Sequence, residues 1–232
     1  MSTSIAVIAH RGASGLAGED NTLRSFALAI EMRCDYVEFD VRRSRDAAIC
    51  FHDARVGLTP VGELTLAELR RRTGVAVPAL EEVLDFCRGR IGLDVEIKDP
   101  GVETEVLAGL RALRGDTPLL VKSFDRGIVA RLSAMAPPCP VGLLVGQTPG
   151  VPPGRALKAA AAACRELHAD FLSPHHGLLA DEAAARAELR ELPAYPWTVN
   201  DPAAMARLAL LPIRGIITDR PDLLLNIVRQ AP

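Results

Sequence analysis

The stretch IAVIAHRGASGLAGEDNTLRSFALAIEMRCDYVEFD, residues 5–40, sets the pattern from which the fold is predicted. It opens on a short apolar run, Ile5–Ala9, continues with helical apolar spacing over Thr22–Met32, and returns to an apolar run at Tyr36–Asp40. Short apolar runs are typical of strands buried on both faces of a parallel sheet, and a helix between them is typical of the crossover that joins such strands. The stretch therefore predicts a β–α–β unit.

The same alternation continues to the end of the chain. We expect eight parallel strands, at Ile5–Ala9, Tyr36–Asp40, Ile91–Ile97, Leu119–Lys122, Val141–Val145, Phe171–Leu172, Pro196–Val199 and Gly215–Thr218. We expect helices at Thr22–Met32, Leu66–Arg72, Leu80–Cys87, Val102–Leu113, Arg126–Met135, Arg155–Leu167, Asp181–Leu192, Pro202–Leu210 and Pro221–Arg229. This order predicts a TIM (β/α)8 barrel formed by a single domain over residues 1–232.

One apolar run, Ile49–Phe51, fits this count poorly, because only a short loop separates it from Tyr36–Asp40. It is either a neighbouring strand or a continuation of the same strand after a bend. If it is a barrel strand, then Val141–Val145 or Phe171–Leu172 must have another role.

The composition is that of a protein able to bury a full core. The 232 residues are 49% hydrophobic and 24% charged, and the formal net charge of −2 gives no reason to expect nucleic acid or an anionic membrane as partner. The five cysteines are scattered and odd in number, so we expect reduced thiols. No stretch approaches the ~20 apolar residues of a membrane span, and IAVIA is too short for a signal peptide. We expect a cytoplasmic protein without stable membrane association and make no prediction of its oligomeric state.

Polar side chains recur at the ends of the predicted strands. They are His10–Arg11, Glu38, Asp40, His52–Asp53, Glu96, Lys98, Lys122–Ser123, Trp197, Asn200 and Asp219. In a barrel these strand ends converge on one face, where active sites are built. We therefore expect one polar site at the carboxyl rim.

Three carboxyl groups are candidate metal ligands. Alternation along YVEFDV places Glu38 and Asp40 on one face, and the same rule in LDVEIKD places Asp94, Glu96 and Lys98 on one face. Carboxylates that converge repel one another unless a cation lies among them, and an all-oxygen set favours Mg²⁺ or Ca²⁺. From spacing alone, an ion-pair cluster with Lys98 and Arg11 is an equally good interpretation.

His10 and His52 are candidate acid–base residues, because each ends a predicted strand and imidazole titrates near neutral pH. Asp53 is placed to orient one of the rings. Arg11 and Lys98 supply positive charge for a phosphate oxygen, or neutralise the carboxylates, or do both. Trp197 is either core packing or a wall of the pocket.

Other polar residues are weaker candidates for a functional role. We expect His168 to be an exposed helix residue, whereas His175 or His176 follows a predicted strand and can face the barrel mouth. The run Arg70–Arg72 is typical of a solvated helix face, with an interaction patch as the alternative.

In their order, these motifs resemble those of the glycerophosphodiester phosphodiesterase family over nearly the full chain. The first motifs are HRG (10–12), EDNT (19–22), E-x-D (38–40) and HD (52–53). The later motifs are VPALEEVL (77–84), LDVEIK (93–98), VKSFD (121–125), PWTVND (196–201) and GIITDRPD (215–222). The resemblance implies hydrolysis of a glycerophosphodiester, a small molecule, to glycerol 3-phosphate and an alcohol. The attacking group is either water or the substrate's own glycerol hydroxyl, which would give a cyclic phosphate first.

The resemblance also implies a role for each matched residue. Glu38, Asp40 and Glu96 would be metal ligands, His10 and His52 the catalytic acid–base pair, and Arg11, Lys98 and Trp197 would contact the substrate.

The chain departs from the family pattern in three places. EDNT stands where PENT is usual, so Asp20 replaces a longer carboxylate. Arg33–Cys34 stands where a glycine-containing pair usually ends the first helix, which removes a favourable C-terminal cap. The segment after His52, DARVGLTPVGELT (53–65), is shorter than usual and lacks the customary Arg-Thr stretch, which leaves the covering of the substrate open.

Two further hypotheses follow. A lysophospholipase D-like or phosphoinositide phospholipase C-like activity would use the same site, and an apolar rim around the mouth would favour it. A catalytically silent phosphodiester-binding barrel is the alternative outside enzymes, although binding alone needs no acid–base pair.

Overall fold

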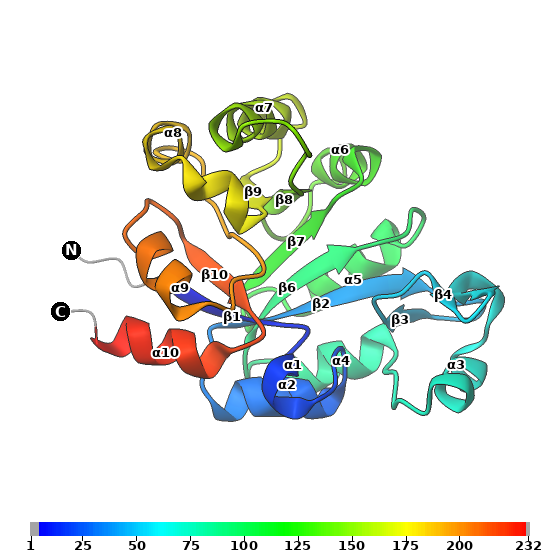
Figure 1. The fold of residues 1–232 in the computed structure, drawn as a ribbon. Helices are drawn as coiled ribbons and strands as arrows, with labels where there is room; N and C mark the ends of the chain where they lie inside the picture. Colours follow the sequence, from blue (N-terminus) through cyan, green and yellow to red (C-terminus); the bar gives the residue numbers. More distant parts are fainter. Residues whose placement is uncertain (1–4, 231–232) are drawn as a thin grey trace.

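The computed structural model of this chain describes residues 5–230, in which strands and helices alternate (Figure 1). The strands are β1 (Ala6–His10), β2 (Tyr36–Arg43), β3 (Ala48–Cys50), β4 (Arg55–Val56), β5 (Thr59–Pro60), β6 (Gly92–Ile97), β7 (Leu119–Ser123), β8 (Val141–Val145), β9 (Phe171–Pro174) and β10 (Gly215–Thr218). The α-helices are α1 (Ser14–Ala17), α2 (Leu23–Glu31), α3 (Leu66–Thr73), α4 (Leu80–Cys87), α5 (Glu103–Ala112), α6 (Arg126–Ala134), α7 (Pro153–Glu166), α8 (Glu182–Glu188), α9 (Pro202–Leu208) and α10 (Pro221–Gln230). Two 3₁₀ turns are Val61–Glu63 and His176–Ala180.

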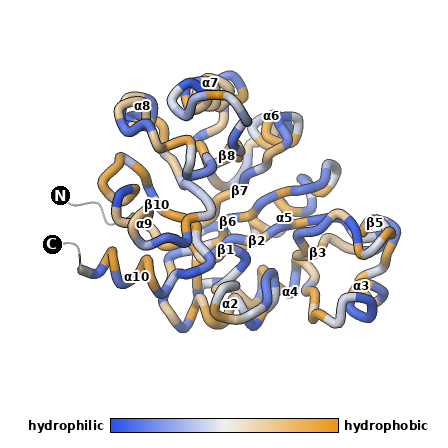
Figure 2. The backbone as a smooth tube through the Cα atoms, viewed as in Figure 1, coloured by the Kyte–Doolittle hydropathy of each residue, from blue (hydrophilic) through white to orange (hydrophobic). Residues whose placement is uncertain are grey.

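The barrel is built from parallel strands in the order β10-β1-β2-β6-β7-β8-β9. The helices surround this curled sheet in Figure 1. β6 is buried along its whole length, and Figure 2 shows apolar residues along the central strands and mixed polarity along the outer helices. The predicted TIM-barrel class is confirmed. That a single domain spans residues 1–232 stays a prediction, since residues 1–4 and 231–232 lie outside the described part.

The predicted strand Pro196–Val199 is wrong as a regular strand. Residues 194–199 nevertheless lie between β9 and β10, because the Trp197 N–H donates to the Pro174 carbonyl (3.1 Å) and the Val199 N–H to the Ile217 carbonyl (3.0 Å). Pro193 and Pro196 have no N–H to donate, so a continuous ladder cannot form here. The eighth position of the barrel is therefore filled by an irregular segment.

The ambiguous run Ile49–Phe51 corresponds to β3, which pairs antiparallel with the end of β2 (Val41 opposite Cys50). It is an extension beyond the barrel, so both β8 and β9 are barrel strands. The chain that follows forms the small β4–β5 ribbon and α3, packed on a second core of Ile49, Val61, Leu64, Leu69 and Val77.

Helix boundaries differ from expectation mainly at α8. Its predicted range, Asp181–Leu192, is too long, because Pro193 disfavours helical backbone at the preceding residue. The short α1 and the turn His176–Ala180 were not predicted.

All five cysteines are free, as expected. Within the described residues, every helix is too short or too polar to span a bilayer.

Candidate active site

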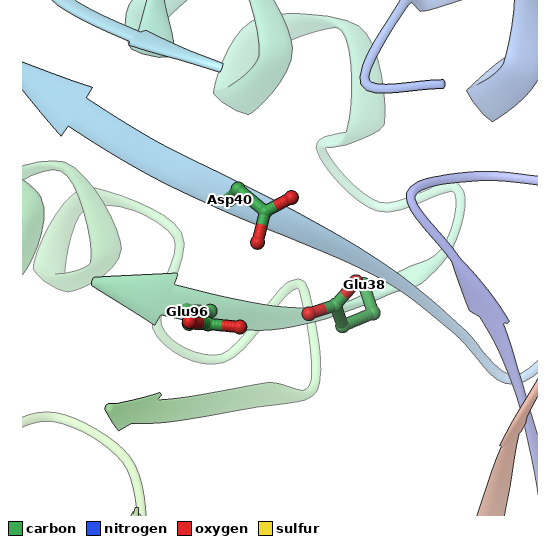
Figure 3. Close-up of side chains that lie close together, drawn as sticks. All are labelled: Glu38, Asp40 and Glu96. Carbon is green, nitrogen blue, oxygen red and sulfur yellow. The ribbon is translucent and has the colours of Figure 1, made fainter. Parts of the chain in front are cut away.

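Three carboxyl groups meet at one point of the sheet. Asp40 on β2 lies opposite Glu96 on the neighbouring β6, and Glu38 follows the alternation along β2 to the same face (Figure 3). One oxygen from each lies within 4.8 Å of the other two, and the residues are only 1–5% exposed. The alternation in YVEFDV and LDVEIK thus produces the convergence predicted from the sequence.

Cations also touch this cluster. Lys98 Nζ lies 2.6 Å from Glu96 Oε1 and 3.1 Å from Asp40 Oδ1, while Arg11 Nε lies 3.2 Å from Asp40 Oδ2. The ion pairs that the sequence left as an alternative are therefore present. Even so, Asp40 Oδ1 and Glu96 Oε1 are buried and accept no hydrogen bond of acceptable geometry. Both oxygens keep lone pairs for a further cation.

A second buried ion pair lies beside Glu38. Lys122 Nζ is 2.5 Å from Asp94 Oδ2 and 3.6 Å from Glu38 Oε1, and both Lys122 and Asp94 are almost completely buried. The centre then holds four carboxyl groups (Glu38, Asp40, Asp94, Glu96) against the three cations Arg11, Lys98 and Lys122. One divalent ion would more than offset this difference.

Crowding of the carboxyl groups changes their pKa values. Burial, together with the charge of Asp40, raises the pKa of Glu96 to about 7. Burial also raises the pKa of Asp94 to about 6, although Lys122 opposes it. For Asp40 burial is outweighed by Lys98, Arg11 and Asn21, so its pKa falls to about 2. A cation beside Glu96 would favour its charged form.

His10 ends β1 and is held by Asp219. Its Nδ1 lies 2.6 Å from Asp219 Oδ1, and its Nε2 lies 3.9 Å from Glu38 Oε2. Burial lowers the pKa of His10, but the hydrogen bond to Asp219 and the charge of Glu38 outweigh it, so the net shift is upward. Ser14 and Asn200 in turn donate hydrogen bonds to Asp219, at 3.0 and 2.6 Å.

His52 follows β3 and is more exposed, with 38% of its side chain accessible. Its Nδ1 lies 2.8 Å from Asp53 Oδ1, the orienting contact expected from the sequence. The guanidinium of Arg42 donates to the His52 carbonyl oxygen (2.7 Å) and steadies this turn.

A cavity of about 230 Å³ unites most of the predicted residues. Those lining it are His10, Arg11, Glu38, His52, Glu96, Lys98, Lys122 and Trp197. Asp40 lies just behind this wall, where it contacts Lys98 and Arg11. Trp197 is a wall of the cavity, with its indole N–H donating to the Ser173 carbonyl (2.8 Å) and its ring edge-on to Phe124.

The remaining candidates lie outside this cavity. His175 packs edge-on against Trp197 and stacks on His176, and neither histidine lines the cavity. His168 is exposed, as expected, but it lies just after α7. In Arg70–Arg72 the side chains are exposed, and Arg70 pairs with Glu82 on the surface.

Sequence reasoning missed the role of Asn21. Its amide exchanges two hydrogen bonds with Asp40, donating to Oδ2 (2.9 Å) and accepting from the Asp40 N–H (3.1 Å). Its backbone is left-handed (φ 53°), a conformation that asparagine tolerates better than most residues. The sequence feature that could have indicated this role is the EDNT motif, which contains Asn21. Asp20 of the same motif pairs with Arg11 Nη1 at 3.0 Å.

The glycine of the HRG motif, Gly12, is favoured by its backbone conformation and by close packing against Ser25. Gly12 has φ 84°, and a Cβ there would lie 2.3 Å from Ser25 Oγ. Arg11 is itself left-handed (φ 52°), which lets its backbone N–H donate to Glu38 Oε2 at 3.2 Å. Such strain is common at functional sites.

Fold and site together define a (β/α) barrel protein with an acidic, histidine-flanked centre at the carboxyl ends of its strands. The model of the glycerophosphoryl diester phosphodiesterase family matches residues 10–223. The chain is 31% identical to YhdW of Bacillus subtilis strain 168, covering 95% of this chain and 96% of that protein. It is 28% identical to a glycerophosphodiester phosphodiesterase of Caldanaerobacter subterraneus, covering 97% of this chain and 98% of that protein.

Solved structures agree on the fold. A protein of Silicibacter pomeroyi DSS-3 superposes with a TM-score of 0.83 at 26% identity, covering 99% of this chain and 94% of that one. An Oleispira antarctica phosphodiesterase, solved in complex with the product sn-glycerol-3-phosphate, superposes with a TM-score of 0.80 at 24% identity, covering 97% of each chain. The chain belongs to the glycerophosphoryl diester phosphodiesterase family, and it is thus a phosphoric diester hydrolase.

Proposed function

We propose that this enzyme hydrolyses small glycerophosphodiesters to glycerol 3-phosphate and an alcohol, and that the reaction depends on Mg²⁺ or Ca²⁺. The observation that carries the proposal is the cavity lined by two histidines, three cationic side chains and two members of the carboxylate cluster, with Asp40 directly behind them. The product complex of the Oleispira antarctica phosphodiesterase, which shares the fold, supports glycerol 3-phosphate as a product.

The metal would be held by Glu38, Asp40 and Glu96. Their donors are all carboxylate oxygens, which suit hard divalent ions. Two of these oxygens, Asp40 Oδ1 and Glu96 Oε1, are buried with only the Lys98 ammonium in contact. When bound, such an ion supplies positive charge for the phosphoryl oxygens and orients the attacking hydroxyl. Asn21 would keep Asp40 in place through its two hydrogen bonds.

His10 and His52 would divide the proton transfers. One imidazole takes the proton of the attacking water or glycerol hydroxyl, and the other gives a proton to the departing alcohol oxygen. Each ring has a carboxylate at Nδ1, Asp219 for His10 and Asp53 for His52, which leaves Nε2 for the substrate. Trapping a cyclic glycerophosphate would identify the glycerol hydroxyl as nucleophile.

Arg11 and Lys98 would bind the phosphate. Both line the cavity and already contact carboxylates, so they can balance charge and hold a phosphate oxygen in the same site. Trp197 would close one side of the substrate pocket.

The proposal is tested by measuring the alcohol and glycerol 3-phosphate released from a panel of glycerophosphodiesters with Mg²⁺, Ca²⁺ or a chelator. We expect His10→Ala and His52→Ala each to lower kcat by about 10²–10⁴-fold with little change in Tm, because rim residues contribute little to the core. His168→Asn, at an exposed position away from the cavity, is the matched control and should turn over normally. Full activity in either cavity variant would contradict the mechanism.

A further inference from the structure

The backbone of His52 has few contacts that fix its position. His52 follows β3 in a stretch without regular secondary structure, and 38% of its side chain is exposed. Among the described residues, the His52 backbone makes one hydrogen bond, which its carbonyl oxygen accepts from Nε of Arg42 at 2.7 Å. The place of the imidazole in the cavity therefore depends on Arg42.

Arg42 is itself held by its strand and by a carboxylate. It lies near the end of β2, where β3 pairs with this strand, and only 14% of its side chain is exposed (Figure 1). Its Nη1 lies 2.5 Å from Oδ1 of Asp99, and Oδ2 of the same carboxylate accepts the backbone N–H of Arg43 at 3.0 Å. The N–H groups of a guanidinium have set directions, so this carboxylate orients the whole group. Arg42 therefore presents Nε to the His52 carbonyl in one orientation.

Asp99 connects this contact to the carboxylate cluster. It directly follows Lys98, whose ammonium lies in the cluster and whose backbone N–H donates to the Val41 carbonyl of β2 at 3.0 Å. A chain of contacts thus runs from Lys98 through Asp99 and Arg42 to His52. Neither Arg42 nor Asp99 lines the cavity of about 230 Å³, so neither is placed to touch a substrate there.

We propose that Arg42, oriented by Asp99, is a positioning residue that keeps His52 at the distance from the substrate that proton transfer requires. This inference rests on the proposed function, in which His52 transfers a proton. Proton transfer needs hydrogen-bond contact, and a displacement of ~1 Å in an active site can lower the rate about 10²-fold. Arg42 thus contributes to kcat and little to the binding of the substrate.

The test measures kcat, KM and Tm of Arg42→Met with glycerophosphocholine and the metal ion that supports turnover. Methionine is unbranched and flexible, like the aliphatic part of arginine, but it donates no hydrogen bond. We expect kcat to fall about 10–10²-fold while KM changes little. Arg43→Met is the matched control, because the Arg43 side chain pairs with Glu105 on the surface and its backbone N–H still reaches Asp99. It should keep the kcat of the unaltered enzyme.

A double-variant cycle separates the positioning of His52 from a general loss of order. In His52→Ala, the further change Arg42→Met should not lower kcat again, because the group that Arg42 positions is absent. Asp99→Ala should lower kcat in the same direction as Arg42→Met, without a further loss when the two are combined. Because Asp99 is partly exposed, Asp99→Ala tests the same contact even if Arg42→Met lowers Tm.

The possible results distinguish this inference from the function on which it rests. If Arg42→Met and Asp99→Ala keep full kcat, or if Arg42→Met lowers kcat equally with and without the His52 side chain, the positioning role is overturned and the phosphodiesterase function stands. Full activity in His52→Ala, or no turnover of any glycerophosphodiester by the unaltered enzyme, would contradict both proposals.

Discussion

Asp219 raises the pKa of His10 although it directly follows the last strand of the barrel, β10, and His10 ends the first, β1. Its hydrogen bond and charge oppose the effect of burial and raise the pKa of His10. Asp219→Asn should therefore lower the pKa of His10 and move the limb of the kcat–pH profile that His10 controls to lower pH. The alkaline limb moves if His10 donates a proton, and the acidic limb moves if it accepts one.

Ser14→Ala is the matched control for this experiment. It removes one hydrogen bond to Asp219 but keeps the carboxylate beside His10, so its profile should stay close to that of the unaltered enzyme. If Asp219→Asn lowers kcat without moving either limb, Asp219 does not act through the ionisation of His10.

Lys122 has a structural role beside the proposed metal ligands. Its ammonium is buried between Asp94 and Glu38, and its removal leaves the buried Asp94 without its ion-pair and hydrogen-bond partner. We expect Lys122→Met to lower the free energy of unfolding by about 3–5 kcal/mol in urea denaturation. The double variant Lys122→Met/Asp94→Leu should recover much of this loss. A single variant as stable as the original would mean that the ion pair contributes little.

The positions of some site residues could be predicted from the sequence, and those of others could not. Glu38, Asp40 and Glu96 followed from strand alternation, because the alternation is local. In the sequence, Asp219 appeared only as one of the polar side chains at the strand ends and Asn21 only as part of EDNT. Their hydrogen bonds to His10 and Asp40 could not be read from it, since they join residues 209 and 19 positions apart. Such contacts depend on which strands become neighbours, and that information is not local.

At the level of elements, α2 ends on an unfavourable residue. Arg33 follows the helix with φ 61°, a conformation that costs an L-residue about 1–2 kcal/mol and glycine almost nothing. Arg33→Gly should therefore raise the free energy of unfolding by about 0.5–1 kcal/mol, reduced by the greater freedom of glycine in the unfolded chain. Arg24→Gly, at an exposed position in the first turn of the same helix, should instead lower it, by up to about 1 kcal/mol. A loss of stability in Arg33→Gly would contradict the capping argument.

Most barrel strands could be predicted from their apolar runs, and the exceptions have physical reasons. Residues 194–199 carry the apolar pattern, but two prolines prevent the ladder. Apolar content alone did not reveal that Ile49–Phe51 would turn back against β2, because strand direction depends on the intervening loop. The length of α8 was overestimated because helical spacing continued toward Pro193.

At the scale of the whole molecule, barrel closure brings residues from opposite ends of the chain to one rim. β1 pairs with β10, which places His10 near Asp219, and β2 pairs with β6, which assembles the carboxylate cluster. The ordered motifs were sufficient to predict this rim. The cavity lined by the start of α6, the end of β8 and α7 was not predictable, since it depends on how two helices pack over β8. A cytoplasmic location and the absence of nucleic-acid partners stay predictions.

The most direct test of the central proposal is the rate of glycerol 3-phosphate release from glycerophosphocholine before chelation, after chelation, and after Mg²⁺ or Ca²⁺ is restored. We predict that chelation abolishes turnover, that one of the two ions restores it, and that Glu38→Ala is inactive at every ion concentration while keeping its fold by circular dichroism. Undiminished release in the chelated enzyme, or in Glu38→Ala, would contradict the account.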